Sequence, residues 1–290
     1  MSAEPRPSNS LLQGTTVRDA VAGARARLEE AGVETAAVDA ALLLAHVLGT
    51  TRSGLHADSR RELTESEAAE LERRLARRAA REPLAYVLGE WGFRRLTLTV
   101  DARVLVPRPE TEIVVERCLV RLAGTGAPRV LDVGTGSGAI ALAIADEHPG
   151  ARVTAIDASA GALEVARANT ARAGLTIDLR RHDLYAGLPD GPWDLVVCNP
   201  PYVREDEISG LEPEVRDWEP RGALVGEGAT ERVASDACAV LRPGGALVLE
   251  TAGGRAEEVA GLLRDLGYAD VQTTDDLVGR SRIAEGVTPK

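Results

Sequence analysis

The sequence contains few aromatic residues and only three cysteines, Cys118, Cys198 and Cys238. These cysteines show no Cys-x-x-Cys spacing and have no histidine close by in the sequence. This is not the pattern of a disulfide-rich domain or of a zinc site, so we expect free, buried thiols and no bound metal. Because aromatic residues make up 3% of the chain, the core must consist mainly of alanine, valine and leucine.

Long hydrophobic runs and clustered positive charge are also missing. No segment reaches the roughly 18 apolar residues that a membrane helix needs, and the N-terminal stretch MSAEPRPSNS has no apolar segment typical of a signal peptide. The formal net charge is −11 and no basic stripe is present, which is unusual for a protein that binds nucleic acid. We therefore expect a cytoplasmic protein without direct contact to membranes or nucleic acid, and we expect a monomer.

The first part of the chain is predicted to be helical. Residues 1–14 are rich in proline, serine and asparagine and are expected to be disordered. Helical patterns then begin at Thr16, Thr35 and Thr64, the last with Glu67 in the capping-box position. A short fourth helix is expected in EPLAYVLG, so these patterns predict a small helical domain over residues 15–85.

Two further segments follow. The stretch GFRRLTLTV alternates like a strand and is expected to pair with RVLVP, so residues 86–106 are predicted to form a β-hairpin linker. RPETEIVVERCLVRLA has the pattern of a helix, and from Arg129 onward strand and helix patterns alternate. Residues 107–290 are therefore predicted to form an α/β domain, a doubly wound, mainly parallel sheet with helices on both faces.

A glycine-rich loop joins the first strand of this domain to its helix. In VLDVGTGSGAIALA, Gly134, Thr135, Gly136 and Gly138 occupy the turn. Glycines allow the backbone to approach a ligand closely, and the following helix N-terminus presents free N–H groups. The spacing is Gly-x-Gly-x-Gly rather than the Gly-x-Gly-x-x-Gly of nicotinamide cofactor sites. A tight strand-to-helix turn without a ligand remains the alternative.

Three acidic residues are expected around this loop. Asp157 ends the second strand and can accept hydrogen bonds from both hydroxyls of a ribose, although it could instead cap the next helix. Asp132 precedes the glycines and could face a ligand's ammonium group. Asp183 follows the third strand and could accept from an adenine amino group or be a solvated loop acid; His182 beside it is expected at the surface. Together these carboxylates suit a cationic adenosine ligand better than a pyrophosphate.

The apolar run WDLVVC ends in Asn199, Pro200, Pro201 and Tyr202. In a doubly wound sheet this motif lies at the same edge as the glycine loop. The Asn199 side-chain oxygen and the Pro200 backbone carbonyl could accept the two N–H bonds of a planar nitrogen, and Tyr202 could stack on the flat group. Such a site would orient a weakly nucleophilic amide or aromatic amine for methyl transfer. The alternative is a simple turn, with Cys198 serving as packing.

The glycine loop and acidic residues resemble the class I S-adenosylmethionine-dependent methyltransferases, whose Rossmann-like fold has a mainly parallel seven-stranded sheet. The longer motifs REPLAYVLGEWGF, VLVPRPETE, NPPYV, EPEVRDWEPRGAL and DDLVGRSRIAEG resemble the release factor glutamine methyltransferases over nearly the whole chain. That resemblance implies S-adenosylmethionine as cofactor, S-adenosylhomocysteine as product, and methylation of the glutamine side-chain amide in the Gly-Gly-Gln motif of bacterial peptide chain release factors. It also implies that the helical domain helps to hold the release factor.

The resemblance assigns further residues to the substrate. Asn199, Pro200, Pro201 and Tyr202 fall on the glutamine pocket, and Asn199 also adjoins the cofactor. Phe93 falls on an aromatic position of the pocket, with hairpin packing as the alternative. Arg108, Pro109, Glu110 and Thr111 fall on the loop beside the active site. The alternative for Arg108 and Glu110 is a surface ion pair. Departures from the family pattern lie outside the Asn-Pro-Pro-Tyr motif, at Trp193, at Trp218 and in GEGATERV.

Three other functions remain open at this point. A glutamine methyltransferase of a ribosomal protein would share the chemistry and most of the motifs. A nucleic-acid adenine amino methyltransferase also uses this type of motif, but it would need a basic face for the flipped base. A cofactor-binding adaptor without catalysis would be expected to have a damaged glycine loop or Asn-Pro-Pro-Tyr motif, and both are intact here.

Overall fold

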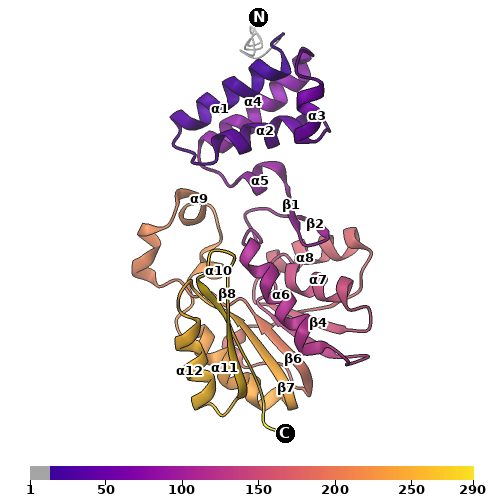
Figure 1. The fold of residues 1–290 in the computed structure, drawn as a ribbon, viewed down its shortest axis with the longest axis vertical. Helices are drawn as coiled ribbons and strands as arrows, with labels where there is room; N and C mark the ends of the chain where they lie inside the picture. Colours follow the sequence, from indigo (N-terminus) through magenta and orange to yellow (C-terminus); the bar gives the residue numbers. More distant parts are fainter. Residues whose placement is uncertain (1–13) are drawn as a thin grey trace, which may run out of the picture. The chain divides into compact units, whose positions relative to one another are not determined.

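The computed structural model describes residues 14–290, which divide into two compact units (Figure 1). One unit ends at Gly89 and the other runs from Glu90 to Lys290. The predicted disordered segment, residues 1–14, falls outside the described residues except for Gly14. The boundary between the units lies inside the segment 86–106, which the sequence predicted as a hairpin linker, and the hairpin itself belongs to the second unit.

The first unit is a helical bundle whose core is built from alanine and leucine side chains. The Thr16 hydroxyl accepts a hydrogen bond from the Asp19 backbone, and Thr64 and Glu67 form a full capping box. Thr35 occupies the N-cap position of its helix without a side-chain hydrogen bond, so all three predicted helix starts are confirmed. Its helices are α1 (Val17–Glu30), α2 (Ala36–Val47), α3 (Arg52–Ala57), α4 (Glu65–Ala79) and α5 (Leu84–Leu88).

A buried ion pair joins two helices of this bundle. Arg78 Nε of α4 donates to Asp39 Oδ2 of α2 at 2.7 Å, and both side chains are almost fully shielded from solvent. Because burial of an unpaired charge is costly, the pair restricts how these two helices can pack.

The hairpin that opens the second unit differs from the prediction. Strands β1 (Glu90–Phe93) and β2 (Leu96–Thr99) pair with each other, and RVLVP forms no strand. The physical reason is a turn at Arg94, whose backbone adopts a left-handed φ of 50° and whose N–H donates to Glu112 Oε1 at 2.9 Å. The alternating pattern in GFRRLTLTV therefore continues across two short strands rather than one long one.

A seven-stranded sheet forms the core of the second unit, with the strand order β5-β4-β3-β6-β7-β9-β8. Strands β3 to β7 pair in parallel, while β9 runs antiparallel to both β7 and β8. The predicted mainly parallel fold is thus confirmed. The strands are β3 (Arg129–Val133), β4 (Arg152–Asp157), β5 (Asp178–Arg181), β6 (Trp193–Cys198), β7 (Leu241–Glu250), β8 (Ala269–Asp275) and β9 (Ser281–Val287).

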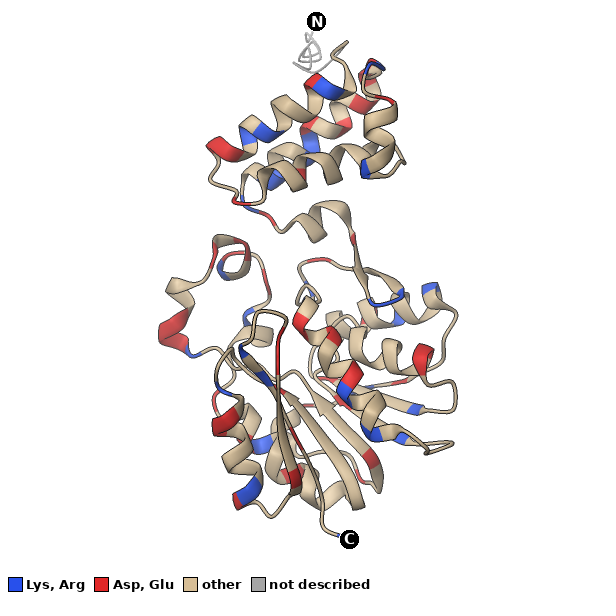
Figure 2. Ribbon diagram, viewed as in Figure 1, with Lys and Arg blue, Asp and Glu red and all other residues tan. Residues whose placement is uncertain are grey.

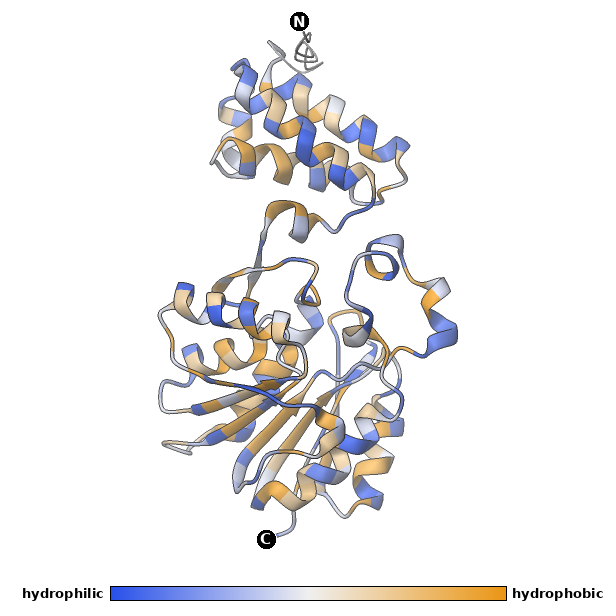
Figure 3. Ribbon diagram, turned by 180° about the vertical axis from the view of Figure 1, so that it is seen from behind, coloured by the Kyte–Doolittle hydropathy of each residue, from blue (hydrophilic) through white to orange (hydrophobic). Residues whose placement is uncertain are grey.

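Helices cover both faces of this sheet (Figure 1). The bounds are α6 (Pro109–Leu122), α7 (Ala139–Glu147), α8 (Ala160–Ala173), α11 (Ala229–Val240) and α12 (Ala256–Asp265). Figure 3 shows the hydrophobic colour concentrated in the central strands, as expected for strands buried on both faces. The parallel strands all end at the same edge, which brings the loops after β3, β4, β5 and β6 together.

The segment between β6 and α11 was not predicted in detail. It contains a short 3₁₀ helix, η2 (Glu205–Gly210), and two single-turn helices, α9 (Pro213–Arg216) and α10 (Arg221–Leu224). A parallel bridge between Val203 and Val225 closes the segment into a loop. We call residues 203–225 the covering segment, because its last residues cover the cavity described below.

The distribution of charged residues agrees with the sequence, in which positive charge is not clustered. In Figure 2, acidic and basic residues alternate along the ribbons of both units without a basic stripe. Within residues 14–290, no helix combines the length and the apolar character needed to cross a bilayer.

Candidate active site

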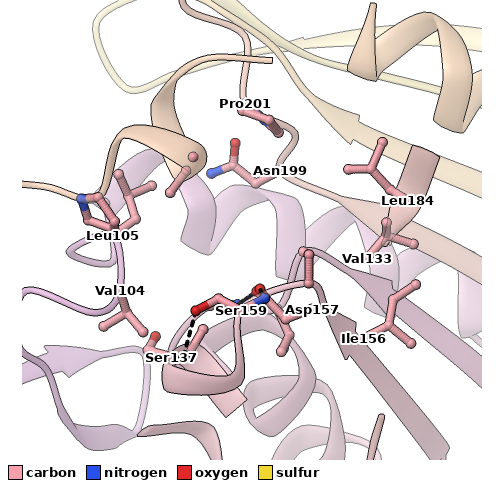
Figure 4. A pocket seen from close by; sticks show the side chains of 18 of the residues that line it. Val104, Leu105, Val133, Ser137, Ile156, Asp157, Ser159, Leu184, Asn199 and Pro201 are labelled. Carbon is pink, nitrogen blue, oxygen red and sulfur yellow. Dashed lines mark hydrogen bonds between the residues drawn. The ribbon is translucent and has the colours of Figure 1, made fainter. Parts of the chain in front are cut away.

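A cavity of about 390 Å³ lies at the edge of the sheet where the parallel strands end (Figure 4). Its walls come from the glycine loop, the ends of β4 and β6, the loop after β5, residues 103–108 and the end of the covering segment. Figure 4 shows Asp157 and Ser159 on one side of the cavity and Asn199 with Pro201 on the other. Segments far apart in the sequence therefore converge on one open cavity.

The glycine loop presents bare backbone to this cavity. Gly134 and Gly136 have φ values of 73° and 55°, and a Cβ added to either would meet nothing within 4 Å. A side chain at these positions would be strained and would project into the open space. Gly138 differs, because its Cβ would press against Leu142 and Ala166, and it does not line the cavity. Two of the three predicted glycines thus face the site, together with Thr135.

Asp157 ties the glycine loop to the next helix. Its Oδ2 accepts from the Gly136 N–H at 2.9 Å and its Oδ1 accepts from the Ser159 N–H at 2.8 Å. The helix cap itself is Ser159, whose hydroxyl accepts from the Ala162 N–H, so Asp157 does not occupy the capping position that the sequence left open as its alternative role. Burial raises the pKa of Asp157 above its usual range. The carboxylate lines the cavity and has acceptor capacity beyond these two bonds.

Asp132 lies behind the loop rather than on the cavity wall. Its side chain is fully buried, and Oδ2 accepts from the Thr135 hydroxyl at 2.6 Å. Its Oδ1 has no hydrogen-bond partner among residues 14–290. Burial, together with the nearby Asp157 charge, raises the pKa of Asp132 to about 7. Because Asp132 is fully buried and does not line the cavity, its contact in the structure is with the glycine loop through Thr135, and the predicted contact with a ligand's ammonium group stays a prediction.

This pKa predicts how stability depends on pH. The pKa of Asp132 is higher in the folded protein than in the unfolded chain, so the folded state binds the proton more tightly. The resulting stabilisation is full below the unfolded pKa and is lost as the pH rises toward 7. From about pH 5.5 to 7, this group alone should lower the unfolding free energy by about 2 kcal/mol. Asp132→Asn cannot ionise and should therefore gain stability relative to wild type at about pH 8 more than at pH 5.5.

Urea unfolding followed by tryptophan fluorescence measures this difference. The three tryptophans, Trp91, Trp193 and Trp218, all lie beyond Gly89, so the signal reports on the second unit. Comparing variant with wild type at each pH removes the contribution of other titrating groups. An equal stability difference at both pH values would mean that Asp132 is ionised in the folded protein throughout this range.

The loop after β5 supplies the far wall of the cavity. Asp183 caps the 3₁₀ helix η1 (Leu184–Ala186) by accepting from the Tyr185 N–H at 3.0 Å, and it lines the cavity with His182. His182 Nε2 lies 2.6 Å from the Gly187 carbonyl. One carboxylate oxygen of Asp183 therefore accepts a hydrogen bond within its own turn. The residue lies at the cavity rim, at the position that the sequence predicted.

The Asn-Pro-Pro-Tyr motif divides between two spaces. Asn199 and Pro201 line the cavity, whereas Pro200 is buried and Tyr202 lines a neighbouring groove. Burial raises the pKa of Tyr202 to about 12, so its hydroxyl stays protonated at neutral pH. Burial also raises the pKa of the Cys198 thiol, which makes it a poor nucleophile.

A chain of hydrogen bonds joins Asn199 to Thr111, which also lines the cavity, and to Glu250; the sequence predicted neither these contacts nor a role for Glu250. The Asn199 Nδ2 donates to the Thr111 hydroxyl at 3.5 Å, and that hydroxyl donates to Glu250 Oε2 at 2.7 Å. Glu250 ends β7 and is 1% exposed. The available signal was weak: an acidic residue at the end of an apolar strand predicted to lie in the same sheet as Asn199.

The predicted loop residues find partners other than each other. Arg108 lines the cavity and pairs with Glu219 of the covering segment, with nitrogen–oxygen distances of 2.7 and 2.8 Å. Glu110 lies 3.7 Å from Arg280 and Arg282. The alternative of an Arg108–Glu110 ion pair is therefore wrong.

Phe93 is not brought to this cavity. Its side chain is 1% exposed in the hairpin and does not belong to the cavity wall. A role in substrate binding stays a prediction for this residue. Among residues 14–290, no cluster of three histidine, cysteine, aspartate or glutamate side chains is arranged to hold a metal ion.

The chain is similar to two protein family models and to individual proteins of bacteria. Residues 19–89 match the family model of the PrmC N-terminal domain, and residues 111–211 match that of the methyltransferase small domain. A release factor glutamine methyltransferase of Caulobacter vibrioides is 40% identical over 278 residues, covering 94% of this chain and 96% of the relative. One of Deinococcus radiodurans is 42% identical over 269 residues, covering 92% and 96%.

A solved structure resembles the chain in fold. The crystal structure of a methyltransferase from Pyrococcus furiosus superposes with a TM-score of 0.53 at 20% identity, covering 76% of this chain and all of that one. At this level of identity the likeness concerns the architecture of the sheet and helices only.

Proposed function

Because the chain belongs to the release factor glutamine methyltransferases, we propose that it methylates the side-chain amide nitrogen of the glutamine in the Gly-Gly-Gln motif of bacterial peptide chain release factors. The observation that carries this proposal is that the open glycine loop and the Asn199 carboxamide line one cavity. A ligand on the loop and an amide held at Asn199 would therefore meet inside one shared cavity.

The residues of the cavity fit S-adenosylmethionine as the cofactor. The open faces of Gly134 and Gly136 admit close backbone contact, and Asp157 can accept from the ribose hydroxyls. The carboxylate of Asp183 lines the cavity and suits an amino group of the cofactor, whereas Asp132 is proposed to act from behind the loop, where it accepts from the Thr135 hydroxyl. When bound, S-adenosylmethionine would supply an electrophilic methyl group for the amide nitrogen and would leave as S-adenosylhomocysteine, with the displaced amide proton passing to solvent.

The protein's own contribution is to orient the glutamine amide. An amide nitrogen is a weak nucleophile because its lone pair is delocalised into the carbonyl group. The Asn199 oxygen would accept one of its N–H bonds from the cavity wall. The Pro200 carbonyl and Tyr202 are proposed to accept the second N–H bond and to stack on the amide plane, although Pro200 is buried and Tyr202 lines the neighbouring groove. Holding reactants in a productive geometry can contribute on the order of 7–11 kcal/mol to lowering the barrier. None of these roles requires a covalent intermediate with the enzyme.

The helical unit is proposed to contact the release factor. Its match to the PrmC N-terminal domain supports this role, since that model accompanies the methyltransferase domain in this chain. We further propose that the protein acts in the cytoplasm as a monomer and that it reaches its substrate without binding nucleic acid.

Mass spectrometry of a purified release factor tests the proposed function. After incubation with this protein and S-adenosylmethionine, we expect one added methyl group on the peptide that contains Gly-Gly-Gln, located on the glutamine side chain. A release factor with Gln→Ala at that position is the matched control and should stay unmodified. Ribosomal proteins and a DNA duplex run in parallel, and methylation of either one instead would overturn the substrate assignment.

A further inference from the structure

The carboxamide of Asn199 could face the cavity with either its oxygen or its nitrogen. Only the oxygen can accept an N–H bond from a glutamine amide, while the nitrogen would repel it. The proposed function therefore depends on which way the side chain is turned. Such orientations follow from the hydrogen-bond network around the group rather than from its shape.

The hydrogen bonds around Asn199 determine the orientation of its carboxamide, because the Thr111 hydroxyl has only one proton to donate. The Thr111 hydroxyl has one proton, and it donates this proton to Glu250 Oε2 at 2.7 Å. Its oxygen can then only accept, so the Asn199 atom that faces it at 3.5 Å must be the nitrogen. The Asn199 oxygen is left without a role in this network and is free for the substrate.

The fold holds these three side chains together from three separate elements. Cys198 of β6 lies opposite Leu249 of β7 in the parallel register, so Asn199 and Glu250 are the next residues of two adjacent strands. Thr111 comes from the first turn of α6 and is 5% exposed. Glu250 is 1% exposed and lies outside the cavity wall, whereas Thr111 also borders the cavity, so the buried end of the network is the Thr111–Glu250 hydrogen bond.

We propose that Thr111 and Glu250 are positioning residues, which hold the Asn199 carboxamide with its oxygen available to the substrate amide. This inference rests on the proposed function for its catalytic consequence, but the hydrogen-bond chain itself can be tested without substrate. Neither residue needs to touch the glutamine.

The direction of the hydrogen bonds between Asn199, Thr111 and Glu250 depends on the charge of Glu250. An ionised carboxylate can only accept, which forces the Thr111 proton toward it. A protonated carboxyl group can donate to Thr111, which frees the Thr111 proton for the Asn199 oxygen and allows the carboxamide to turn over. Burial raises the pKa of Glu250 to about 7, so this change falls in an accessible range.

Other charged groups face Glu250 and shape this titration. Arg282 of β9 and Arg108 favour the ionised form, whereas Glu110 of α6 opposes it. Tyr202 also lies in the field of Glu250, but its raised pKa keeps it neutral over the same range. Turnover at saturating S-adenosylmethionine is therefore expected to fall as the pH drops below about 7, in step with protonation of Glu250.

Side-chain NMR tests this hydrogen-bond chain in the protein without substrate. The sequence has three asparagines, Asn9, Asn169 and Asn199, so Nδ2-labelled asparagine yields three amide signals. The Asn199 signal is assigned by its loss in Asn199→Ala. We expect it to titrate near neutral pH in wild type and to stay constant in Glu250→Gln. The Asn169 signal is the internal reference, because its amide donates to the Thr99 and Ser137 carbonyls.

Kinetics with Thr111 variants test the consequence for the reaction. Thr111→Val keeps the shape but removes the hydroxyl, and we expect kcat to fall on the order of 10- to 100-fold with a smaller change in KM for the release factor. Thr111→Ser keeps the hydroxyl and should restore most of the activity. S-adenosylmethionine binding, measured by calorimetry, should change little in both variants, and melting curves report whether each is folded.

The outcomes separate this inference from the proposed function. If the Asn199 signal titrates in wild type but not in Glu250→Gln, the chain stands whatever substrate is methylated. An Asn199 signal that ignores both the pH and the Glu250 substitution would overturn it. So would a Thr111→Val variant with wild-type kcat, since the hydroxyl would then be dispensable.

Discussion

Asn199→Ala is expected to reduce turnover by about 10²- to 10³-fold, a loss similar to that seen when one preorganised hydrogen-bonding group is removed from an active site. The variant loses the oxygen that would accept a glutamine N–H and orient the amide toward the methyl group. Pro200 keeps its backbone carbonyl, so one of the two proposed acceptors remains. Because the glycine loop and Asp157 are untouched, affinity for S-adenosylmethionine should stay within about threefold of wild type.

Single-turnover kinetics and calorimetry measure these two effects separately. Gln272→Ala is the matched control, because it also deletes a carboxamide but from an exposed position on β8. We expect wild-type kinetics for it. A fully active Asn199→Ala would show that the carboxamide does not orient the substrate, whereas a loss of cofactor affinity equal to the loss of turnover would assign Asn199 to the cofactor instead.

The sequence was informative about the sheet because strand and helix patterns alternate over most of the chain from Arg129 onward, apart from the consecutive strands β5 and β6 and β8 and β9. Patterns of this kind are local, and the order of elements follows from them. The hairpin was wrong because one alternating run hid a turn at Arg94, where a non-glycine residue adopts a left-handed conformation that no local signal marks. The covering segment lacked any periodic pattern, so its short helices were not predicted.

For the site, residues at strand ends could be predicted, while their partners could not. Asn199, Asp157 and Asp183 line the cavity because parallel strands end at one edge. Thr111 and Glu250 are 139 residues apart in sequence, and their contact depends on how α6 packs against β7. That packing is a tertiary property, decided by side-chain fit along the whole helix rather than by a motif.

Asp157→Ala is expected to weaken S-adenosylmethionine binding by roughly 100-fold, since hydrogen bonds to a charged group are each worth about 1.5–3 kcal/mol. The variant loses the proposed ribose acceptor. It also frees the Gly136 N–H, which Asp157 Oδ2 holds at 2.9 Å, so the loop becomes less ordered. Because Asp157 is proposed to contact the part of the cofactor distant from the transferred methyl, kcat at saturating cofactor should change far less than the dissociation constant.

Ser159→Ala separates the ligand role of Asp157 from its structural role. Ser159 caps α8 by accepting from the Ala162 N–H, so its loss should cost about 1 kcal/mol of stability. It does not remove the carboxylate, and although Ser159 lies on the cavity wall, its hydroxyl is engaged in the helix cap, so cofactor affinity should remain close to wild type. If Ser159→Ala weakened binding as much as Asp157→Ala, the role of Asp157 would be to hold the loop and helix together. If only Asp157→Ala weakened binding, its carboxylate would contact the cofactor. Asn199→Ala is expected to show the opposite pattern, with reduced turnover and nearly unchanged cofactor affinity. That pattern would place the reacting amide on the other side of the cavity.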